Sequence, residues 1–277
     1  MIKNATCIQV CLFFLATALS TVHSGASGQS IEESIVSVET RENLIQQGVL
    51  SLQGKHTKPE KLLVVISGHP GITRPYKDPA GKIQTRQNGN FLVRSRSHFI
   101  SDKVSLLLLD CRSDFVDICP DAYQASSERS QDVLKLVDAV KKNFPSIREV
   151  WAVSTSRGAI TTAGFIKHAS DRFAGVIHTA ATFSKVYDQK LDFGPSQTSQ
   201  FFIHHRDDPC SMTLFQDAQD ASRRWHIPLV SVTGGGGFHG NKCQAFTQHG
   251  FKGKEAEVGQ AILFIVENGK PKSLQID

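Results

Sequence analysis

The sequence predicts an α/β fold in which a mostly parallel central sheet is covered by helices on both faces. Short apolar runs bounded by turn residues alternate with helical patterns along most of the chain, which is typical of strands joined by helical crossovers. The composition is that of an ordinary globular protein, with 40% hydrophobic and 21% charged residues. Because no linker, low-complexity tract or internal repeat divides the chain, we expect one domain after the N-terminal segment.

The N-terminal segment has the pattern of a secretory signal peptide. Lys3 is the only charged residue before Glu32, an apolar run extends from Cys7 to Leu19, and small residues follow at 24–28. The run is shorter than the ~18 residues that span a bilayer, which disfavours a membrane anchor. We therefore expect export to a secreted or periplasmic location and no stable membrane insertion.

Cleavage is expected after Ala26, or as late as after Gly28. Residues 1–26 would then be the signal peptide and residues 27–277 the single mature domain. The 31 Lys and Arg and 26 Asp and Glu residues are spread along the chain without a basic cluster. Nucleic-acid binders usually concentrate positive charge on one face, so a nucleic-acid partner is not expected.

The expected elements follow from apolar periodicity, taken in chain order. Residues 33–52 have the pattern of two antiparallel strands with Gly48 near the bend. The remaining strands are predicted at 62–68, 104–110, 149–154, 175–180, 200–204 and 228–233. Helices are predicted at 90–100, 127–143, 158–168, 211–225 and 254–267. In such a sheet, sites form beyond the carboxyl ends of the strands, so the residues there are the candidates for chemistry.

The segment after the strand at 149–154 predicts a nucleophile. Ser156 lies in Ser154-Thr155-Ser156-Arg157-Gly158, between a strand and a helix, which is the arrangement of a nucleophile elbow. The usual pattern is Gly-x-Ser-x-Gly, because strand and helix backbones approach closely at this turn. Ser154 replaces the first glycine, which makes the motif less specific. The alternative role for Ser156 is a helix cap.

An acid and a base are expected to follow in the order Ser, Asp, His. Asp208, after the strand at 200–204, is the predicted acid, and Asp207 is the alternate. His249, between the strand at 228–233 and the last helix, is the predicted base, and His239 in the same loop is the alternate. An aspartate hydrogen-bonded to the imidazole would hold it in the tautomer that takes a proton from the serine.

An oxyanion hole is expected from two backbone N–H groups. One belongs to Arg157, which follows the nucleophile, and the other comes from the loop after the strand at 62–68. Pro70 has no N–H, so the early donor is Gly71 or Ile72, and we favour Gly71.

Four cysteines remain after removal of the signal peptide, an even number in an exported chain. They allow three connectivities, of which we favour Cys111–Cys119 and Cys210–Cys243. The second bridge would tie the loop of the predicted acid to the loop of the predicted base. The first would close a small loop beside the same edge of the sheet.

The chain resembles secreted bacterial α/β-hydrolases of undefined substrate. The matching segments are residues 91–96, 155–158 and 204–210, and Cys243 followed by residues 249–253. The resemblance implies the α/β-hydrolase fold and a Ser-His-Asp triad, and it supports Asp208 and His249. Only nineteen residues separate the strands at 175–180 and 200–204, too few for a sizeable cap domain, so we expect an open site.

The predicted function is hydrolysis of carboxylic esters, small or surface-displayed, through an acyl-enzyme intermediate. Peptide or amide cleavage and acyl transfer on the same triad are alternatives, as is a non-catalytic binding protein on this scaffold. No cofactor is expected, because the Gly235-x-Gly237-x-x-Gly240 match lies near the chain end and opens no helix directly. No metal is expected, because adjacent His204 and His205 would point to opposite faces of a strand.

Overall fold

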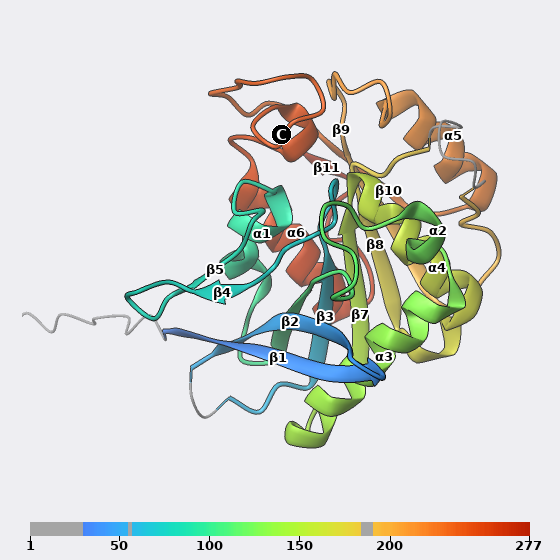
Figure 1. Cartoon of the computed structure of the whole chain (residues 1–277). Helices are drawn as coiled ribbons and strands as arrows, with labels where there is room; N and C mark the ends of the chain where they lie inside the picture. Colours follow the sequence, from blue (N-terminus) through green and yellow to red (C-terminus); the bar gives the residue numbers. More distant parts are fainter. Residues whose placement is uncertain (1–29, 55–56, 184–190) are drawn as a thin grey trace, which may run out of the picture.

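The computed structural model describes residues 30–54, 57–183 and 191–277, so the expected signal peptide lies outside the described residues. A nine-stranded sheet runs through the molecule in the order β1-β2-β6-β3-β7-β8-β9-β10-β11 (Figure 1). Its strands are β1 (Ile31–Arg41), β2 (Leu44–Gln53), β3 (Lys61–Ile66), β6 (Val104–Leu109), β7 (Glu149–Thr155), β8 (Gly175–Thr179), β9 (Ser199–His205), β10 (Leu229–Val232) and β11 (Gln275–Ile276). β1, β2 and β6 pair antiparallel, and the pairs from β6 to β11 are parallel.

Helices cover both faces of this sheet, as the sequence predicts. They are α1 (Phe91–Arg94), α2 (Asp121–Gln124), α3 (Ser127–Asn143), α4 (Ala159–His168), α5 (Phe215–Trp225) and α6 (Glu255–Asn268). Short 3-10 turns occupy residues 96–99, 156–158, 170–172 and 248–250, and β4 (Tyr76–Lys77) and β5 (Ile83–Gln84) form a small separate hairpin.

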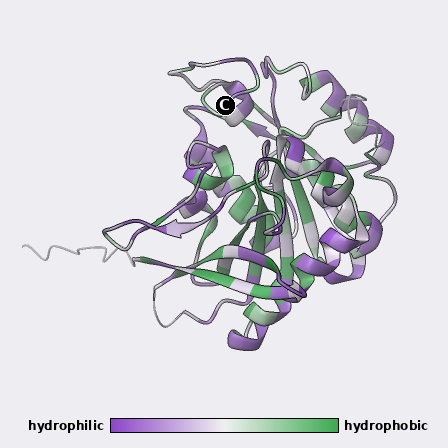
Figure 2. Cartoon of the chain, in the orientation of Figure 1, coloured by the Kyte–Doolittle hydropathy of each residue, from purple (hydrophilic) through white to green (hydrophobic). Residues whose placement is uncertain are grey.

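Alternation along the central strands creates two separate apolar cores. In β3, Leu63 and Val65 face the core that is closed by α1 and α6, whereas Leu62 and Val64 face the core that is closed by α3 and α4. All four side chains are fully buried. Figure 2 shows the resulting apolar strands between helices whose outer faces are polar. A strand that buries both faces has to be apolar throughout, which is why this segment is a continuous hydrophobic run.

Most predicted elements are present with small shifts at their ends, and helix α3 begins and ends where the sequence predicts. Ser126 caps it, because its hydroxyl accepts the N–H of Arg129 at 3.1 Å. The predicted helix at 90–100 is instead α1 followed by a 3-10 turn. The predicted helix at 211–225 begins later, at Phe215.

The expectation for Gly48 was wrong. The bend between β1 and β2 lies at residues 42–43, where Asn43 has a positive φ of 60°, and Gly48 lies inside β2. A Cβ on Gly48 would lie 2.5 Å from the Leu108 carbonyl oxygen, so this glycine permits the close approach of β6.

No helix in the described part of the chain is long and apolar enough to cross a membrane.

Candidate active site

The turn after β7 holds Ser156 in a sharp conformation. Ser156 has φ 54°, lies directly after the last residue of β7, and starts the 3-10 turn that leads into α4. A non-glycine residue at positive φ is uncommon and is found where the surrounding structure enforces it. The strand–turn–helix arrangement predicted from the sequence is therefore present around Ser156.

Packing explains both small residues of this turn. A Cβ on Gly158 would lie 2.7 Å from the Ser67 carbonyl oxygen, a backbone atom that has little room to move. Ser154, which replaces the usual first glycine, is fully buried, and its hydroxyl lies 2.9 Å from that of Thr162 on α4. The extra hydroxyl thus has a partner, and the departure from glycine leaves the turn intact.

The loops after β9 and β10 bring the predicted acid and base together. The Nδ1 atom of His249 lies 3.0 Å from Oδ2 of Asp208, and both side chains are buried. The other carboxylate oxygen, Oδ1, accepts the N–H of Cys210 at 2.9 Å. The hydroxyl of Thr213 lies within hydrogen-bond distance of both partners, a contact that the sequence did not indicate.

The two alternates are not part of this pair. Asp207 is exposed, and its backbone N–H donates to Nδ1 of His205 at 3.1 Å. His239 is also exposed, and its ring stacks on Phe246 with the ring centroids 4.9 Å apart. The structure therefore joins Asp208 to His249 and leaves Asp207 and His239 on the surface.

In the loop after β3, the backbone N–H that we expected to serve an oxyanion is already engaged. The N–H of Gly71 donates to the Gly68 carbonyl at 2.7 Å, so it is engaged inside a turn. Gly68 lies against the nucleophile turn, since a Cβ there would lie 3.1 Å from Cβ of Ser156. The next N–H, that of His69, makes no hydrogen bond within the described residues. The sequence could have pointed to the His69 N–H, because His69 is the last residue with a backbone N–H before Pro70.

Charged groups surround this loop. The side chain of Arg157 is almost fully buried and forms an ion pair with Asp121 at the start of α2. Burial raises the pKa of the Asp121 carboxyl, and the Arg157 charge opposes that rise. Burial is the main cause that lowers the pKa of His69, and the positive charge of Arg157 lowers it further. Both effects favour the neutral imidazole.

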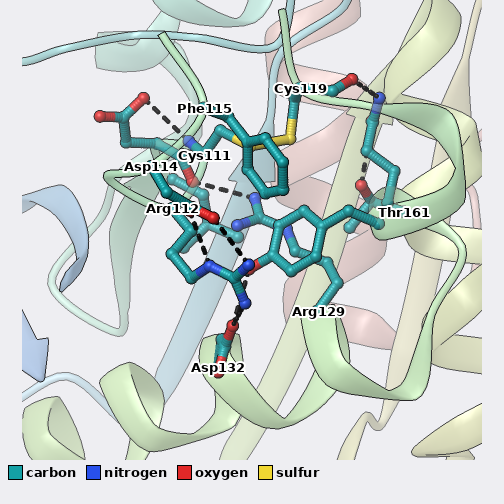
Figure 3. Close-up of a disulfide and its surroundings, with 12 residues drawn as sticks. Cys111, Arg112, Asp114, Phe115, Cys119, Arg129, Asp132 and Thr161 are labelled. Atoms are coloured by element: carbon teal, nitrogen blue, oxygen red, sulfur yellow. Dashed lines mark hydrogen bonds and ion pairs between the residues drawn. A yellow bond between two sulfur atoms is a disulfide. The ribbon is translucent and has the colours of Figure 1, made fainter. Parts of the chain in front are cut away.

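The first disulfide supports the loop after β3. Cys111 is bonded to Cys119, as predicted, and the N–H of Cys119 donates to the Pro70 carbonyl at 2.9 Å. Figure 3 shows this bridge beside Arg112, which forms ion pairs with Asp114 and Asp132. The Arg112 guanidinium also lies 5.2 Å from the ring centroid of Phe115 and 4.6 Å from that of Tyr123, and these two rings contact each other. Burial raises the pKa of Tyr123 to about 12, so its hydroxyl stays protonated as the donor to Asp132 at 2.8 Å.

The second disulfide joins the loop after β9, which holds the predicted acid Asp208 (the acid loop), to the loop after β10, which holds the predicted base His249 (the base loop). Cys210, two residues after Asp208, is bonded to Cys243, six residues before His249. This pairing was also predicted from the sequence and is confirmed.

Two buried histidines, His204 and His178, lie near the site, and the sequence predicted no role in the site for either. His204 in β9 accepts the N–H of Ala181 at 2.8 Å through Nε2, and His178 in β8 lies between Thr162 and Gln200. Burial lowers the pKa of His204 to about 4 and that of His178 to about 3. Both imidazoles are therefore neutral at pH 7 and serve as hydrogen-bonding parts of the core.

The described residues contain no group of three His, Cys, Asp or Glu side chains that could hold a metal ion.

No family model and no curated protein matches the sequence. Solved structures do match. A serine hydrolase without a lid from Xanthomonas campestris is 13% identical, with a TM-score of 0.57, and the match covers 87% of this chain and 97% of that one. An α/β serine hydrolase homologue from Coxiella burnetii is 10% identical over 83% and 95% of the chains, with a TM-score of 0.55. Est1E from Butyrivibrio proteoclasticus is 12% identical over 84% and 98%, with a TM-score of 0.53.

These likenesses establish the architecture. The chain has the α/β-hydrolase fold, as predicted, and the described residues contain no sizeable cap domain.

Proposed function

We propose that this α/β-hydrolase-fold protein is an exported serine hydrolase that cleaves carboxylic esters. Ser156 is the nucleophile, His249 the general base and Asp208 the residue that orients the imidazole. The observation that carries the proposal is the buried hydrogen bond between Asp208 and His249, in loops at the same edge of the sheet as a serine held at positive φ. Solved proteins of this fold that are named serine hydrolases add support.

The reaction follows from these positions. Oγ of Ser156 attacks the ester carbonyl carbon while Nε2 of His249 takes the serine proton. Asp208 accepts the Nδ1–H of His249, so the lone pair on Nε2 is free to act as the base. The imidazolium then returns its proton to the departing alcohol, and the acyl group remains on Ser156. Water, deprotonated by His249, releases the acid and restores the serine.

The oxyanion would be held by two backbone N–H groups, those of Arg157 and His69. His69 replaces Gly71 in this role, because the Gly71 N–H is taken by the Gly68 carbonyl and His69 directly follows Gly68, which lies against Ser156. Two such donors stabilise the charge that develops on the carbonyl oxygen in the transition state.

An open site suits small or surface-displayed esters. Arg94 and Arg96 form ion pairs with Glu255 and Glu33. Their charges are therefore balanced inside the protein, and a neutral ester fits better than an acidic one.

Export accounts for the N-terminal pattern and the two bridges. Residues 1–26 would be removed as the signal peptide, with the cut as late as after Gly28, to leave 27–277. Both bridges would then form in an oxidising compartment outside the cytoplasm.

Hydrolysis of p-nitrophenyl acetate and of its anilide analogue tests the proposal. We expect ester turnover well above anilide turnover, and a loss in kcat/KM of about 10³-fold or more in Ser156→Ala and His249→Ala. Asp208→Asn should lose about 10²- to 10⁴-fold, because the imidazole loses its orienting carboxylate.

The alternates supply matched controls. His239→Ala and Asp207→Asn make the same chemical changes at exposed positions and should keep wild-type activity. Equal losses in His239→Ala and His249→Ala would contradict the assignment. A disulfide-intact, folded protein that turns over neither substrate nor a panel of longer esters would favour a binding protein on this scaffold.

A further inference from the structure

The loop between β9 and α5 places a hydroxyl group between the acid and the base. Oγ1 of Thr213 lies 2.8 Å from Oδ2 of Asp208 and 3.0 Å from Nδ1 of His249, which are themselves 3.0 Å apart. The three polar atoms thus form a small triangle. The Thr213 side chain is fully buried, so water does not stand in for any of its contacts.

The direction of each hydrogen bond in this triangle follows from proton counting. A carboxylate only accepts, so the single proton of the Thr213 hydroxyl is donated to Asp208. The hydroxyl then meets Nδ1 of His249 with a lone pair, which requires the proton of the neutral imidazole to be on Nδ1. Its one N–H faces two oxygens, and the lone pair of Nε2 is left for Ser156.

The backbone of this loop fixes Thr213 in place. Its N–H donates to the Cys210 carbonyl at 3.0 Å, while the N–H of Cys210 donates to Oδ1 of Asp208 at 2.9 Å. Cys210 is in turn bonded to Cys243 in the base loop. Helix α5 begins two residues after Thr213, at Phe215. This closed turn explains why α5 starts later than the periodicity of the sequence predicts.

We propose that Thr213 is a positioning residue of the triad, whose hydroxyl holds the Asp208 carboxylate and gives the imidazole of His249 a second acceptor. The proposal rests on the proposed function, since it concerns the orientation of the His249 imidazole toward Ser156. A ring held by one oxygen can tilt about that single bond, whereas a ring whose N–H faces two oxygens is restrained in a second direction. Small losses of alignment are costly for proton transfer.

Substitutions at Thr213 separate the hydroxyl from the shape of the side chain. Thr213→Val keeps the shape and removes the hydroxyl, and Thr213→Ser keeps the hydroxyl. With p-nitrophenyl acetate, we expect Thr213→Val to lower kcat about 10- to 100-fold, the effect of losing one hydrogen bond to a charged group, with little change in KM. Thr213→Ser should retain most of the wild-type kcat.

Thr198→Val is the matched control for the loss of a buried threonine hydroxyl. Thr198 lies just before β9, at the opposite end of the strand from Asp208, and donates to the Ser170 carbonyl at 2.6 Å. It should keep the wild-type kcat. If Thr213→Val is unstable, the pair Thr213→Ala and Thr213→Ser makes the same comparison. A wild-type kcat in Thr213→Val or Thr213→Ala, or a loss as large in Thr213→Ser, overturns the proposal.

A spectroscopic measurement keeps this inference apart from the proposed function. In ¹⁵N-histidine-labelled protein, the Nδ1–H proton of His249 is identified by its absence in His249→Ala. We expect that resonance to shift and to exchange faster with water in Thr213→Val and not in Thr198→Val. A wild-type protein without ester turnover would defeat the proposed function alone. An unchanged resonance in Thr213→Val would defeat the role of Thr213, whatever the activity.

Discussion

Removal of the Cys210–Cys243 bridge tests how the two halves of the site are held together. The bridge closes a loop with a sequence separation of 33, whereas Cys111–Cys119 closes one of 8. In the chain-entropy treatment of cross-links, the larger loop corresponds to about 4 kcal/mol of folding free energy and the smaller to about 2.5 kcal/mol. The double variant Cys210→Ala/Cys243→Ala should therefore lose more stability than Cys111→Ala/Cys119→Ala.

Urea unfolding of both double variants under non-reducing conditions measures this difference. Trp151 and Trp225 report unfolding by fluorescence, and the free energies are compared at equal m-values. The alanine variants keep the Cys210 N–H, so the bond to Asp208 is still available and the change isolates the cross-link. Equal losses, or a larger loss for the short loop, would refute the entropic reasoning.

The same variant has a consequence for the site. The bridge and the Asp208–His249 contact both connect the acid loop to the base loop. Without the bridge, we expect ester turnover to fall at urea concentrations that leave the tryptophan fluorescence native. Loss of turnover and of fluorescence in one common transition would show that the loops need no cross-link to stay aligned.

Two further predictions concern the core beneath the site. First, acid should destabilise the protein through its buried histidines: His204 and His178 stay neutral when folded but protonate below their ordinary pKa of about 6.5 when unfolded. The free energy of unfolding is then highest above about pH 6.5 and falls by about 2 kcal/mol per histidine at pH 5. Urea unfolding at pH 7.5 and at pH 5 measures this loss, and His204→Gln should remove about half of it. A midpoint that is the same at both pH values would contradict it. Second, Gly158→Ala should lower the free energy of unfolding by about 2 kcal/mol or more, because its Cβ would lie 2.7 Å from the Ser67 carbonyl oxygen, whereas Gly236→Ala, with nothing within 4 Å, should be nearly neutral. Equal thermal stability of the two variants would show that the turn relaxes freely.

Much of the fold could be predicted because its signals are local. The apolar run of β3 and the capped, periodic segment of α3 each specify one element without help from distant residues. The two-residue β11 was missed because so short a strand has no periodicity, and it exists through pairing with β10. Gly48 was misplaced because a glycine that admits a neighbouring strand looks, in one sequence, like a glycine in a turn.

In the site, too, the residues marked by local sequence signals could be predicted, and those that depend on the three-dimensional path of the chain could not. Ser156, Asp208 and His249 could be chosen because each follows a strand in the required chain order, and the structure places Asp208 and His249 in contact. Thr213 could not be chosen, because its role depends on how the chain turns back after Cys210. Gly71 was chosen from the residues after Pro70, and the hydrogen bond that engages its N–H could not be foreseen because it depends on how the chain turns at Gly68.

The measurement that tests the central claim most directly is labelling with a fluorophosphonate probe followed by peptide mapping. Wild-type protein should be labelled on Ser156, Ser156→Ala should not be labelled, and His249→Ala should be labelled far more slowly, because the serine loses its base. Labelling at another serine, or none in the folded protein with both bridges intact, would contradict the assignment of Ser156 as an activated nucleophile.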